Sequence, residues 1–271
     1  MLSKDIQMKI PFTKCHANGN DFIFLFSNEL NIDILNESII KQLCNRHTGV
    51  GADGLFVISD SIKNDFLLDY YNSDGSWETL CANGSRCAVL LMNKLNKIKT
   101  KCTFMAGDGQ HFSQMVSNDI VEMEMRTPEY KTDLISPEGF DGYFINSGAR
   151  HFVCESNNLN DDYVYNSGKK IRNSDFFSPK GVNVNFFNID KDKNIKVKTY
   201  EKGVENVMFS CASGSTAVVF HLAQTKMIKE TTTTTSPGGS LIFTFDEAWK
   251  NVTIKGPAKI VFSGQYYLNK I

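Results

Sequence analysis

The stretch Cys81-Ala-Asn-Gly-Ser-Arg-Cys-Ala-Val-Leu90 decides how the chain is organised, because Cys211-Ala-Ser-Gly-Ser-Thr-Ala-Val-Val-Phe220 repeats it. The two stretches share Cys, Ala, Gly, Ser and Val at matching places and begin 130 residues apart (81 to 211). In each, a Gly-Ser turn precedes apolar residues at helical spacing, which predicts helices at 85–97 and 215–227. Each cysteine is therefore expected just before a helix N-terminus.

The same offset relates other landmarks of the two halves. It carries aromatic and glycine positions onto one another: Phe22 onto Phe152, Gly51 onto Gly181, Phe56 onto Phe186, and Tyr70 onto Tyr200. We interpret this as an internal duplication. The prolines at 128 and 137 place a seam near 127–136, so we expect one half at 1–130 with Cys81 and another at 131–271 with Cys211.

Strand-like runs lead each half, so the expected fold class is α+β. They lie at 21–26, 54–59 and 66–71 in the first half, and at 143–145, 151–154, 182–189 and 195–200 in the second. The chain from 231 onward, with its five threonines and a Pro-Gly-Gly turn, also reads as β-structure.

The composition argues against several classes of function. The 271 residues carry 29 Lys and Arg against 30 Asp and Glu, a net charge of −1 with no basic face, which argues against nucleic-acid binding and favours a small-molecule partner. No apolar run approaches the roughly 18 residues of a membrane span, and residues 1–14 lack the apolar core of a secretory signal. We therefore expect a cytoplasmic protein without a membrane partner.

The cysteines point to free thiols. There are seven of them, an odd number, and none forms a CxxC pair, which favours a reducing compartment over a disulfide scaffold. The five histidines show no zinc-ligand spacing, so no metal site is expected. Five cysteines have no assigned role: Cys44, Cys87, Cys102 and Cys154 are expected in the core, and Cys15 near the cleft.

The two repeated cysteines have a chemistry of their own. A thiol at a helix N-terminus feels the positive end of the helix dipole, which stabilises the thiolate and makes it a usable base. The N–H groups of the same turn can hold a carboxylate. Two such thiols facing each other across a cleft could remove a proton from one side of a carbon and return one to the other, which inverts a stereocentre without a cofactor.

An ordered set of motifs, spanning about residues 14–260, resembles the diaminopimelate epimerase family. These motifs are, in order, Cys15-His-Ala-Asn-Gly-Asn-Asp-Phe, Asn45-Arg-His-Thr-Gly-Val-Gly-Ala-Asp-Gly, Asn72-Ser-Asp-Gly-Ser, Cys81-Ala-Asn-Gly-Ser-Arg-Cys, Gly181-Val-Asn-Val-Asn-Phe, Tyr200-Glu-Lys-Gly and Pro237-Gly-Gly. The resemblance implies two pseudo-symmetric domains, each a β-barrel-like sheet around a central helix, with the last strand, about 262–271, returning to the first domain. It also implies conversion of LL-diaminopimelate to the meso form without pyridoxal phosphate, in lysine biosynthesis.

The resemblance further implies which residues act. Cys81 and Cys211 become the acid/base pair. Substrate contacts fall on Asn20, Asn72, Asn183 and Glu201, and the helix starts Ala82-Asn83 and Ala212-Ser213 would bind the reacting carboxylate. A homodimer is an assembly compatible with this reading.

The sequence departs from the family pattern at four places. Ala82 and Ala212 stand where Gly usually follows each catalytic Cys, which crowds the carboxylate site unless the backbone angles are ordinary. Lys202 replaces a substrate-clamping Arg and loses its bidentate fork. Ala149-Arg150 replaces Asn-Pro, so Arg150 is a candidate for the missing clamp.

These departures leave alternatives open. The enzyme could act on another amino acid, the chain could be a cysteine-nucleophile hydrolase with a His partner, or it could be an inactive binding protein. His16, His47 and His151 are either structural or supporting residues. Asp53 and Asp74, each followed by Gly, read most simply as turn residues.

Overall fold

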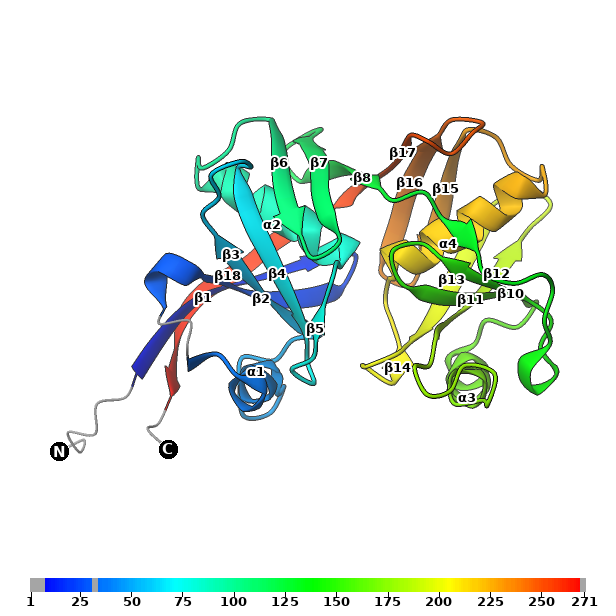
Figure 1. The fold of residues 1–271 in the computed structure, drawn as a ribbon, viewed down its shortest axis with the longest axis horizontal. Coiled ribbons are helices and arrows are strands. Elements are labelled where there is room, and N and C mark those ends of the chain that lie inside the picture. The colour runs from blue at the N-terminus through cyan, green and yellow to red at the C-terminus, as the bar shows by residue number, and fades with distance from the viewer. Residues whose placement is uncertain (1–7, 31–33, 269–271) are drawn as a thin grey trace.

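Alternating burial along the chain produces the strands. In β4 (Phe66–Asn72) every second residue is buried, as expected for a strand with one face on the core. β3 (Gly54–Ser59) and β12 (Asn183–Ile189) are buried along most of their length, because both of their faces are covered. The computed structural model describes residues 8–30 and 34–268 (Figure 1).

In that part of the chain the remaining strands are β1 (Met8–Ala17), β2 (Asn20–Phe26), β5 (Trp77–Glu78), β6 (Lys101–Ala106), β7 (Gly109–Met115), β8 (Ile120–Met125), β9 (Glu129–Tyr130), β10 (Tyr143–Asn146), β11 (Arg150–Glu155), β13 (Ile195–Glu201), β14 (Asn206–Val207), β15 (Thr231–Ser236), β16 (Gly239–Phe245), β17 (Val252–Pro257) and β18 (Lys259–Leu268). The helices are α1 (Glu37–Cys44), α2 (Ala82–Lys94), α3 (Asp161–Arg172) and α4 (Ala212–Gln224), with short 3-10 turns η1 (Ser27–Glu29) and η3 (Pro137–Gly139).

These elements form two lobes. The first lobe contains β1 to β8, β18, α1 and α2, and the second contains β9 to β17, α3 and α4 (Figure 1). One continuous curled sheet runs through both, because β8 of the first lobe pairs antiparallel with β17 of the second. β18 returns to the first lobe and pairs antiparallel with β1, with Met8 opposite Leu268.

The lobes repeat each other closely. β6, β7 and α2 recur as β15, β16 and α4 with both ends shifted by the same 130 residues. The parallel pair of β2 and β3 recurs as the parallel pair of β11 and β12. The predicted pseudo-symmetric α+β fold is confirmed, as are the expected strands and the β-structure from 231 onward.

Each lobe encloses one helix. Every residue of α2 from Ala82 to Met92 is buried, and α4 is buried almost as completely. A helix buried on all its faces must be surrounded, and the curled sheet does this in both lobes (Figure 1). The four cysteines expected in the core are buried, and Cys15, expected near the cleft, is buried as well and does not line the cavity between the lobes.

The predicted limits of the two central helices are wrong by one turn. Both helices begin directly after their cysteine and end three residues earlier than expected. Gly84 is a residue of the first turn, not of a preceding loop, and a Cβ there would lie 2.0 Å from the Phe56 ring. At the other end, Asn96 and Lys226 adopt left-handed backbone angles that stop each helix.

The short outer helices were not predicted. α1 and α3 lie on the outside of the lobes, and each begins at an asparagine, Asn36 or Asn160, whose side chain accepts a hydrogen bond from a first-turn amide. In α3, acidic residues in the first turn and basic residues in the last complement the helix dipole.

Candidate active site

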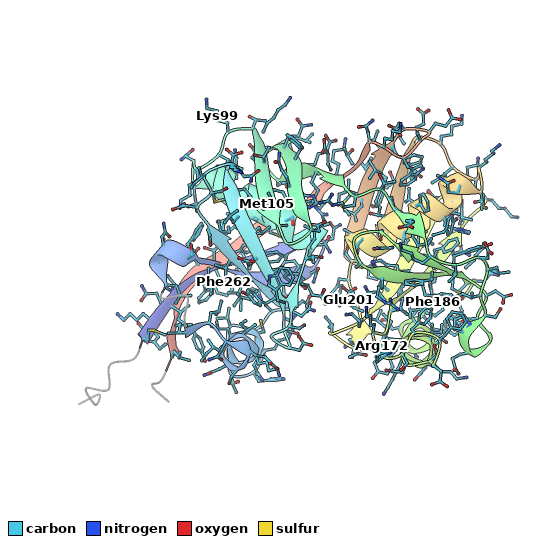
Figure 2. The ribbon with its side chains drawn as sticks, in the orientation of Figure 1. Lys99, Met105, Arg172, Phe186, Glu201 and Phe262 are labelled. Atoms are coloured by element: carbon cyan, nitrogen blue, oxygen red, sulfur yellow. The ribbon has the colours of Figure 1, made fainter. Side chains whose placement is uncertain are left out.

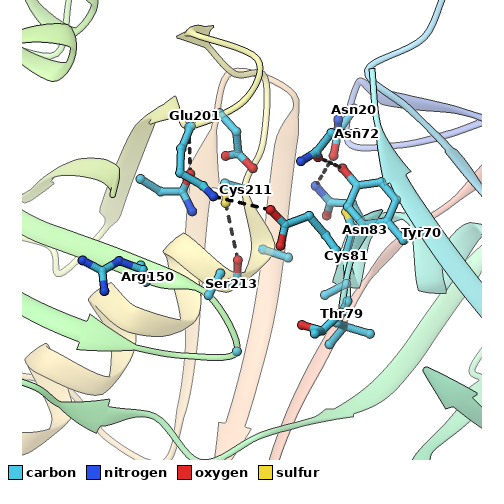
Figure 3. Close-up of a pocket in the computed structure, with 18 of the residues that line it drawn as sticks. Asn20, Tyr70, Asn72, Thr79, Cys81, Asn83, Arg150, Glu201, Cys211 and Ser213 are labelled. Atoms are coloured by element: carbon cyan, nitrogen blue, oxygen red, sulfur yellow. Dashed lines mark hydrogen bonds and ion pairs between the residues drawn. The ribbon is translucent and has the colours of Figure 1, made fainter. Parts of the chain in front are cut away.

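One cavity of about 280 Å³ between the lobes is lined by both repeated cysteines. Cys81 and Cys211 stand on its opposite walls (Figure 3). All the residues predicted from the sequence to bind substrate line it too: Asn20, Asn72, Ala82, Asn83, Arg150, Asn183, Glu201, Lys202, Ala212 and Ser213. The fold thus brings together residues that are up to 193 positions apart (20 to 213).

Cys81 occupies the N-cap position of α2. Its backbone is extended, with φ −132° and ψ 110°, and its thiol faces the amides of Asn83 and Gly84. Burial raises the pKa of the Cys81 thiol to about 12, while the two amides and the Arg86 cation act in the opposite direction. Burial therefore works against the thiolate, and the helix start works for it.

Cys211 occupies the same position at α4. Its φ of −128° and ψ of 107° nearly match those of Cys81, as the duplication requires. Burial raises the pKa of the Cys211 thiol well above its ordinary value, and the neighbouring Glu201 carboxylate raises it further. Hydrogen bonds from Ser213 and from the amide of Gly214 favour the thiolate instead.

A hydrogen-bonded chain fixes the direction of the Ser213 hydroxyl. Thr199 donates to Asn185 Oδ1 at 2.9 Å, so the Asn185 amide nitrogen points to His151 Nδ1, 3.0 Å away. His151 Nδ1 is therefore an acceptor, and Nε2 donates to Ser213 Oγ at 3.0 Å. The Ser213 hydroxyl is left to donate to Cys211 Sγ, 3.6 Å away.

His151 is neutral in this chain of contacts. It is completely buried, and burial lowers its pKa to about 3. It lies in a supporting position behind Ser213, one of the two alternatives left open by the sequence.

Glu201 lies at the boundary between the lobes (Figure 2). Burial raises the pKa of its carboxyl to about 7, against the opposing effect of the Cys211 thiol. Its Oε2 is buried and has no hydrogen-bond partner among the described residues. Glu201 thus carries a carboxyl that titrates near neutrality beside one of the two thiols.

The two helix starts differ in charge. Arg86 is fully buried in the first turns of α2, and its hydrogen bonds all go to neutral oxygens, of Asn18, Asn83 and Ala82. Burial lowers its pKa to about 10, which still leaves it charged at neutral pH. The equivalent residue of α4 is Thr216, whose hydroxyl donates to the Ala212 carbonyl at 2.8 Å. A cation therefore supports the Cys81 wall, and no equivalent side chain supports the Cys211 wall.

A polar network supports Asn20 from behind. Asn20 donates to Asp53 Oδ2 at 2.8 Å and accepts from Asn83 at 3.0 Å. Arg46 bonds to Asp53 as well, at 2.7 Å. Asp53 is therefore more than the turn residue predicted, because its half-buried carboxylate orients Asn20. Asp74 does form a turn, through Ser76.

The far end of the cavity is lined from both lobes. Asn72 accepts from the Tyr70 hydroxyl at 2.6 Å, and Asn183 accepts from the Lys202 amide at 2.8 Å. The Lys202 ammonium lies 3.4 Å from Glu78 Oε1 of the other lobe.

Arg150 lines the cavity, but its guanidinium points away from Cys211 (Figure 3). Its Nε donates to the Gly181 carbonyl at 2.9 Å, and the guanidinium lies over the Phe144 ring, 4.7 Å from its centroid. In this conformation the cation beside Asn183 is Lys202.

Sequence reasoning missed several residues around the cavity. Glu78 lies only three residues before Cys81, and Arg86 lies within the repeated stretch itself, but no local pattern indicates their contacts. Tyr70 adjoins the Asn72 motif and is held by stacking on Phe56, with ring centroids 4.7 Å apart. Asn185 lies within the quoted Gly181-Val-Asn-Val-Asn-Phe motif, but no local pattern indicates its contact with His151.

With this geometry established, comparisons with known proteins identify the family. A family model described as diaminopimelate epimerase matches residues 12–130. A diaminopimelate epimerase of Flavobacterium psychrophilum is 38% identical over 92% of this chain and 97% of its own length. The chain belongs to the diaminopimelate epimerase family. A further member, from Aquifex aeolicus, is 34% identical over 94% of this chain and 97% of its own.

Solved structures share the fold of this diaminopimelate epimerase family member. A hydroxyproline epimerase from Agrobacterium vitis superposes with a TM-score of 0.78 at 14% identity, covering 100% of this chain and 95% of that one. A probable proline racemase from Agrobacterium radiobacter gives a TM-score of 0.76, also at 14% identity, covering 96% and 93%. At such identities the likeness concerns the fold alone.

The two alanines that depart from the family pattern fit their places. Ala82 and Ala212 begin helices, and neither has a positive φ, so the backbone does not require glycine there. Each methyl group adds to the cavity wall beside its thiol.

Within residues 8–30 and 34–268, no helix has the length and apolar character to cross a membrane, and no cluster of side chains suited to a metal ion is found.

Proposed function

We propose that this protein is an amino-acid epimerase that interconverts LL- and meso-diaminopimelate without a cofactor. One observation carries the proposal: two thiols stand at equivalent helix N-termini on opposite walls of one cavity. The family supports the choice of substrate, since its members are named for this reaction.

In the proposed reaction, the thiolate on one wall removes the α-proton. The electron pair of the broken C–H bond moves onto the substrate carboxylate, where the first-turn amides beginning at Ala82 and Ala212 stabilise its charge. The opposite thiol then donates a proton to the other face of the carbon. One cysteine ends as a thiol and the other as a thiolate, so the total charge does not change.

The residues around the thiols have roles in this scheme. Arg86 stabilises negative charge at the Cys81 wall, and the Ser213 hydroxyl does so at Cys211, directed by His151. Asn20 and Glu201 would contact the reacting amino acid. Asn72, Asn183 and Lys202 would contact the distal end, with Arg150 available only if it leaves Phe144 and Gly181.

The test is α-proton exchange in heavy water with LL-diaminopimelate and no added cofactor. Wild-type protein is expected to incorporate deuterium at the α-carbon and to form the meso isomer. Cys81→Ser and Cys211→Ser should each lose inversion by about 10²-fold or more, because positioned acid/base groups typically contribute that much. If no amino acid tried exchanges its α-proton, the proposal fails.

One observation supports a different amino acid as an alternative substrate. Ala149 and Lys202 replace an amide and a guanidinium of the family pattern at the distal end of the cavity. Exchange with another amino acid and none with diaminopimelate would leave the epimerase chemistry intact and change the substrate. A cysteine hydrolase is disfavoured, since His151 bonds to Ser213 rather than to a thiol.

We also propose a cytoplasmic location and a homodimer. All seven cysteines are free, which suits a reducing compartment. β18 exposes Val261, Phe262 and Tyr267 to about half of their surface, an apolar face that a second copy could cover. Cell fractionation tests the first proposal. Light scattering tests the second, with twice the 30.5 kDa chain mass expected.

The division of the chain at residue 130 is likewise a proposal. It is supported by the 130-residue offset and by the return of β18 to β1 in the first lobe. Residues 269–271 of the expected last strand lie outside the described residues. Limited proteolysis that cuts first within 127–136 would support this division, and first cuts elsewhere would argue against it.

A further inference from the structure

Glu78 and Lys202 form an ion pair across the cavity. Glu78 belongs to β5 of the first lobe, and Lys202 follows β13 of the second, with 3.4 Å between Glu78 Oε1 and Lys202 Nζ. Among the ion pairs of residues 8–30 and 34–268, this pair is the only one that joins the lobes. Both residues line the cavity that holds the two thiols.

The backbone fixes both partners, while their charged groups stay available. The register of β4 and β5 places Glu78 opposite Tyr70, and the Lys202 amide donates to Asn183 at 2.8 Å. The side chains keep 39% and 30% of their surface exposed. Their separation is longer than the roughly 2.8 Å of a strong charge-assisted hydrogen bond, so the pair is loose.

We propose that this pair binds the distal end of the substrate as a zwitterion, with Glu78 taking the ammonium and Lys202 the carboxylate. The inference rests on the proposed function. The Glu78–Lys202 pair has no net charge, and neither does the distal end of the substrate. When the pair opens, the Glu78 carboxylate can bind the distal ammonium and the Lys202 ammonium can bind the distal carboxylate. Lys202 alone would accept a distal carboxylate whether or not an ammonium stood beside it. Glu78 is thus the specificity-determining residue for the distal ammonium.

Three ligands distinguish the contribution of the distal ammonium from that of the distal carboxylate. LL-Diaminopimelate carries both distal groups, L-2-aminopimelate lacks the distal ammonium, and L-lysine keeps a terminal ammonium but lacks the distal carboxylate. The experiment measures kcat/KM of α-proton exchange for LL-diaminopimelate and the inhibition constants of the other two. The variants are Glu78→Gln and Lys202→Met, each compared with wild type.

Loss of one charged hydrogen bond predicts about a 10- to 100-fold effect. Glu78→Gln should lower kcat/KM for LL-diaminopimelate by this factor and weaken lysine binding, while the inhibition constant of 2-aminopimelate changes by less than about 3-fold. Lys202→Met should weaken diaminopimelate and 2-aminopimelate but leave lysine nearly unchanged. Glu78→Asp, which keeps the charge, should recover part of the activity if Glu78→Gln folds poorly.

A matched control pair lies outside the cavity. Glu138 and Lys170 form a comparably loose ion pair, 3.5 Å apart, within the second lobe. Glu138→Gln and Lys170→Met should leave all three constants unchanged.

Two results overturn the inference. If Glu78→Gln affects all three ligands equally, Glu78 serves only the contact between the lobes. If it raises kcat/KM for diaminopimelate, Glu78 competes with the substrate for Lys202. Failure of the proposed function looks different, because wild type itself would then exchange no α-proton.

Discussion

Asn83, in the first turn of α2, donates a hydrogen bond to the carbonyl of Ser210, the residue before Cys211, at 3.1 Å. The same amide nitrogen bonds to Asn20 at 3.0 Å, and the Asn83 Oδ1 accepts from Arg86 at 2.8 Å. One buried side chain therefore ties the segment that carries one thiol to the segment that carries the other. We therefore expect the spacing of the two walls to depend on this contact.

Asn83→Ala tests that dependence. It removes a fully buried amide and leaves the Ser210 carbonyl, Asn20 and Arg86 each short of a partner, which should cost about 2–4 kcal/mol of unfolding free energy. Urea unfolding measures the loss. Asn166→Ala removes an exposed bond to the Asp162 carbonyl and should stay within about 0.5 kcal/mol. Equal effects of the two substitutions would contradict a special role for Asn83.

Arg86→Met tests the cation behind Cys81. The substitution keeps an apolar stem but removes the charge, so the pKa of the Cys81 thiol should rise and its alkylation by iodoacetamide should slow severalfold. Peptide mass spectrometry isolates the Cys81 rate from those of the other cysteines. Arg86→Lys keeps the charge and should react nearly as wild type does. An unchanged rate in Arg86→Met would show that the amides alone support the thiolate.

Glu201 should leave a signature in the pH dependence of stability. Its pKa is raised from 4.5 to about 7, so between these values the folded protein holds a proton that the unfolded chain releases. This contribution is fully present below pH 4.5 and is lost as pH rises through 7, about 3 kcal/mol in all. Glu201→Gln lacks the titration and should therefore gain stability relative to wild type across that window. Urea unfolding at pH 4.5 to 8 measures the difference, and a flat difference would refute the raised pKa.

His151 should remain neutral throughout the working range. With a pKa lowered to about 3 and Nδ1 accepting from Asn185, its ring is expected to carry the proton on Nε2. Ring ¹⁵N chemical shifts recorded from pH 5 to 8 report both properties. A proton on Nδ1, or a titration near the ordinary value of about 6.5, would show that Ser213 is oriented some other way.

Much of the fold could be predicted from the repeat. The offset between Cys81 and Cys211 places two helices, the strands before them and the strands after them, and the structure keeps the same offset. The predicted helix starts are wrong because Gly and Ser, as at Gly84 and Ser85, favour turns over helices when judged locally. In the structure Gly84 lies inside the helix, where the Phe56 ring leaves no room for a side chain. Local propensity cannot report a contact with a strand that lies 28 residues earlier (56 to 84).

The site residues that lie in sequence motifs could be predicted. Contacts between residues that are far apart in the sequence could not. The residues carried over from the family motifs all line the cavity. Glu78 meets Lys202 across 124 positions, and no pattern near either residue indicates that they pair. His151 shows the same limit, because its role depends on Asn185 and Ser213, which come from a neighbouring strand and from α4.

The exchange of Arg86 for Thr216 makes the two walls unequal although the backbone is nearly symmetric. No catalyst can change the equilibrium between two stereoisomers, so the ratio of the forward and reverse kcat/KM values is fixed by the substrate alone. The buried guanidinium can therefore change the individual kcat and KM values in each direction, but it cannot change the ratio of the two kcat/KM values. Duplication supplied two walls related by a near two-fold rotation, and Arg86 is one of the side chains that make the two directions of the reaction kinetically distinct.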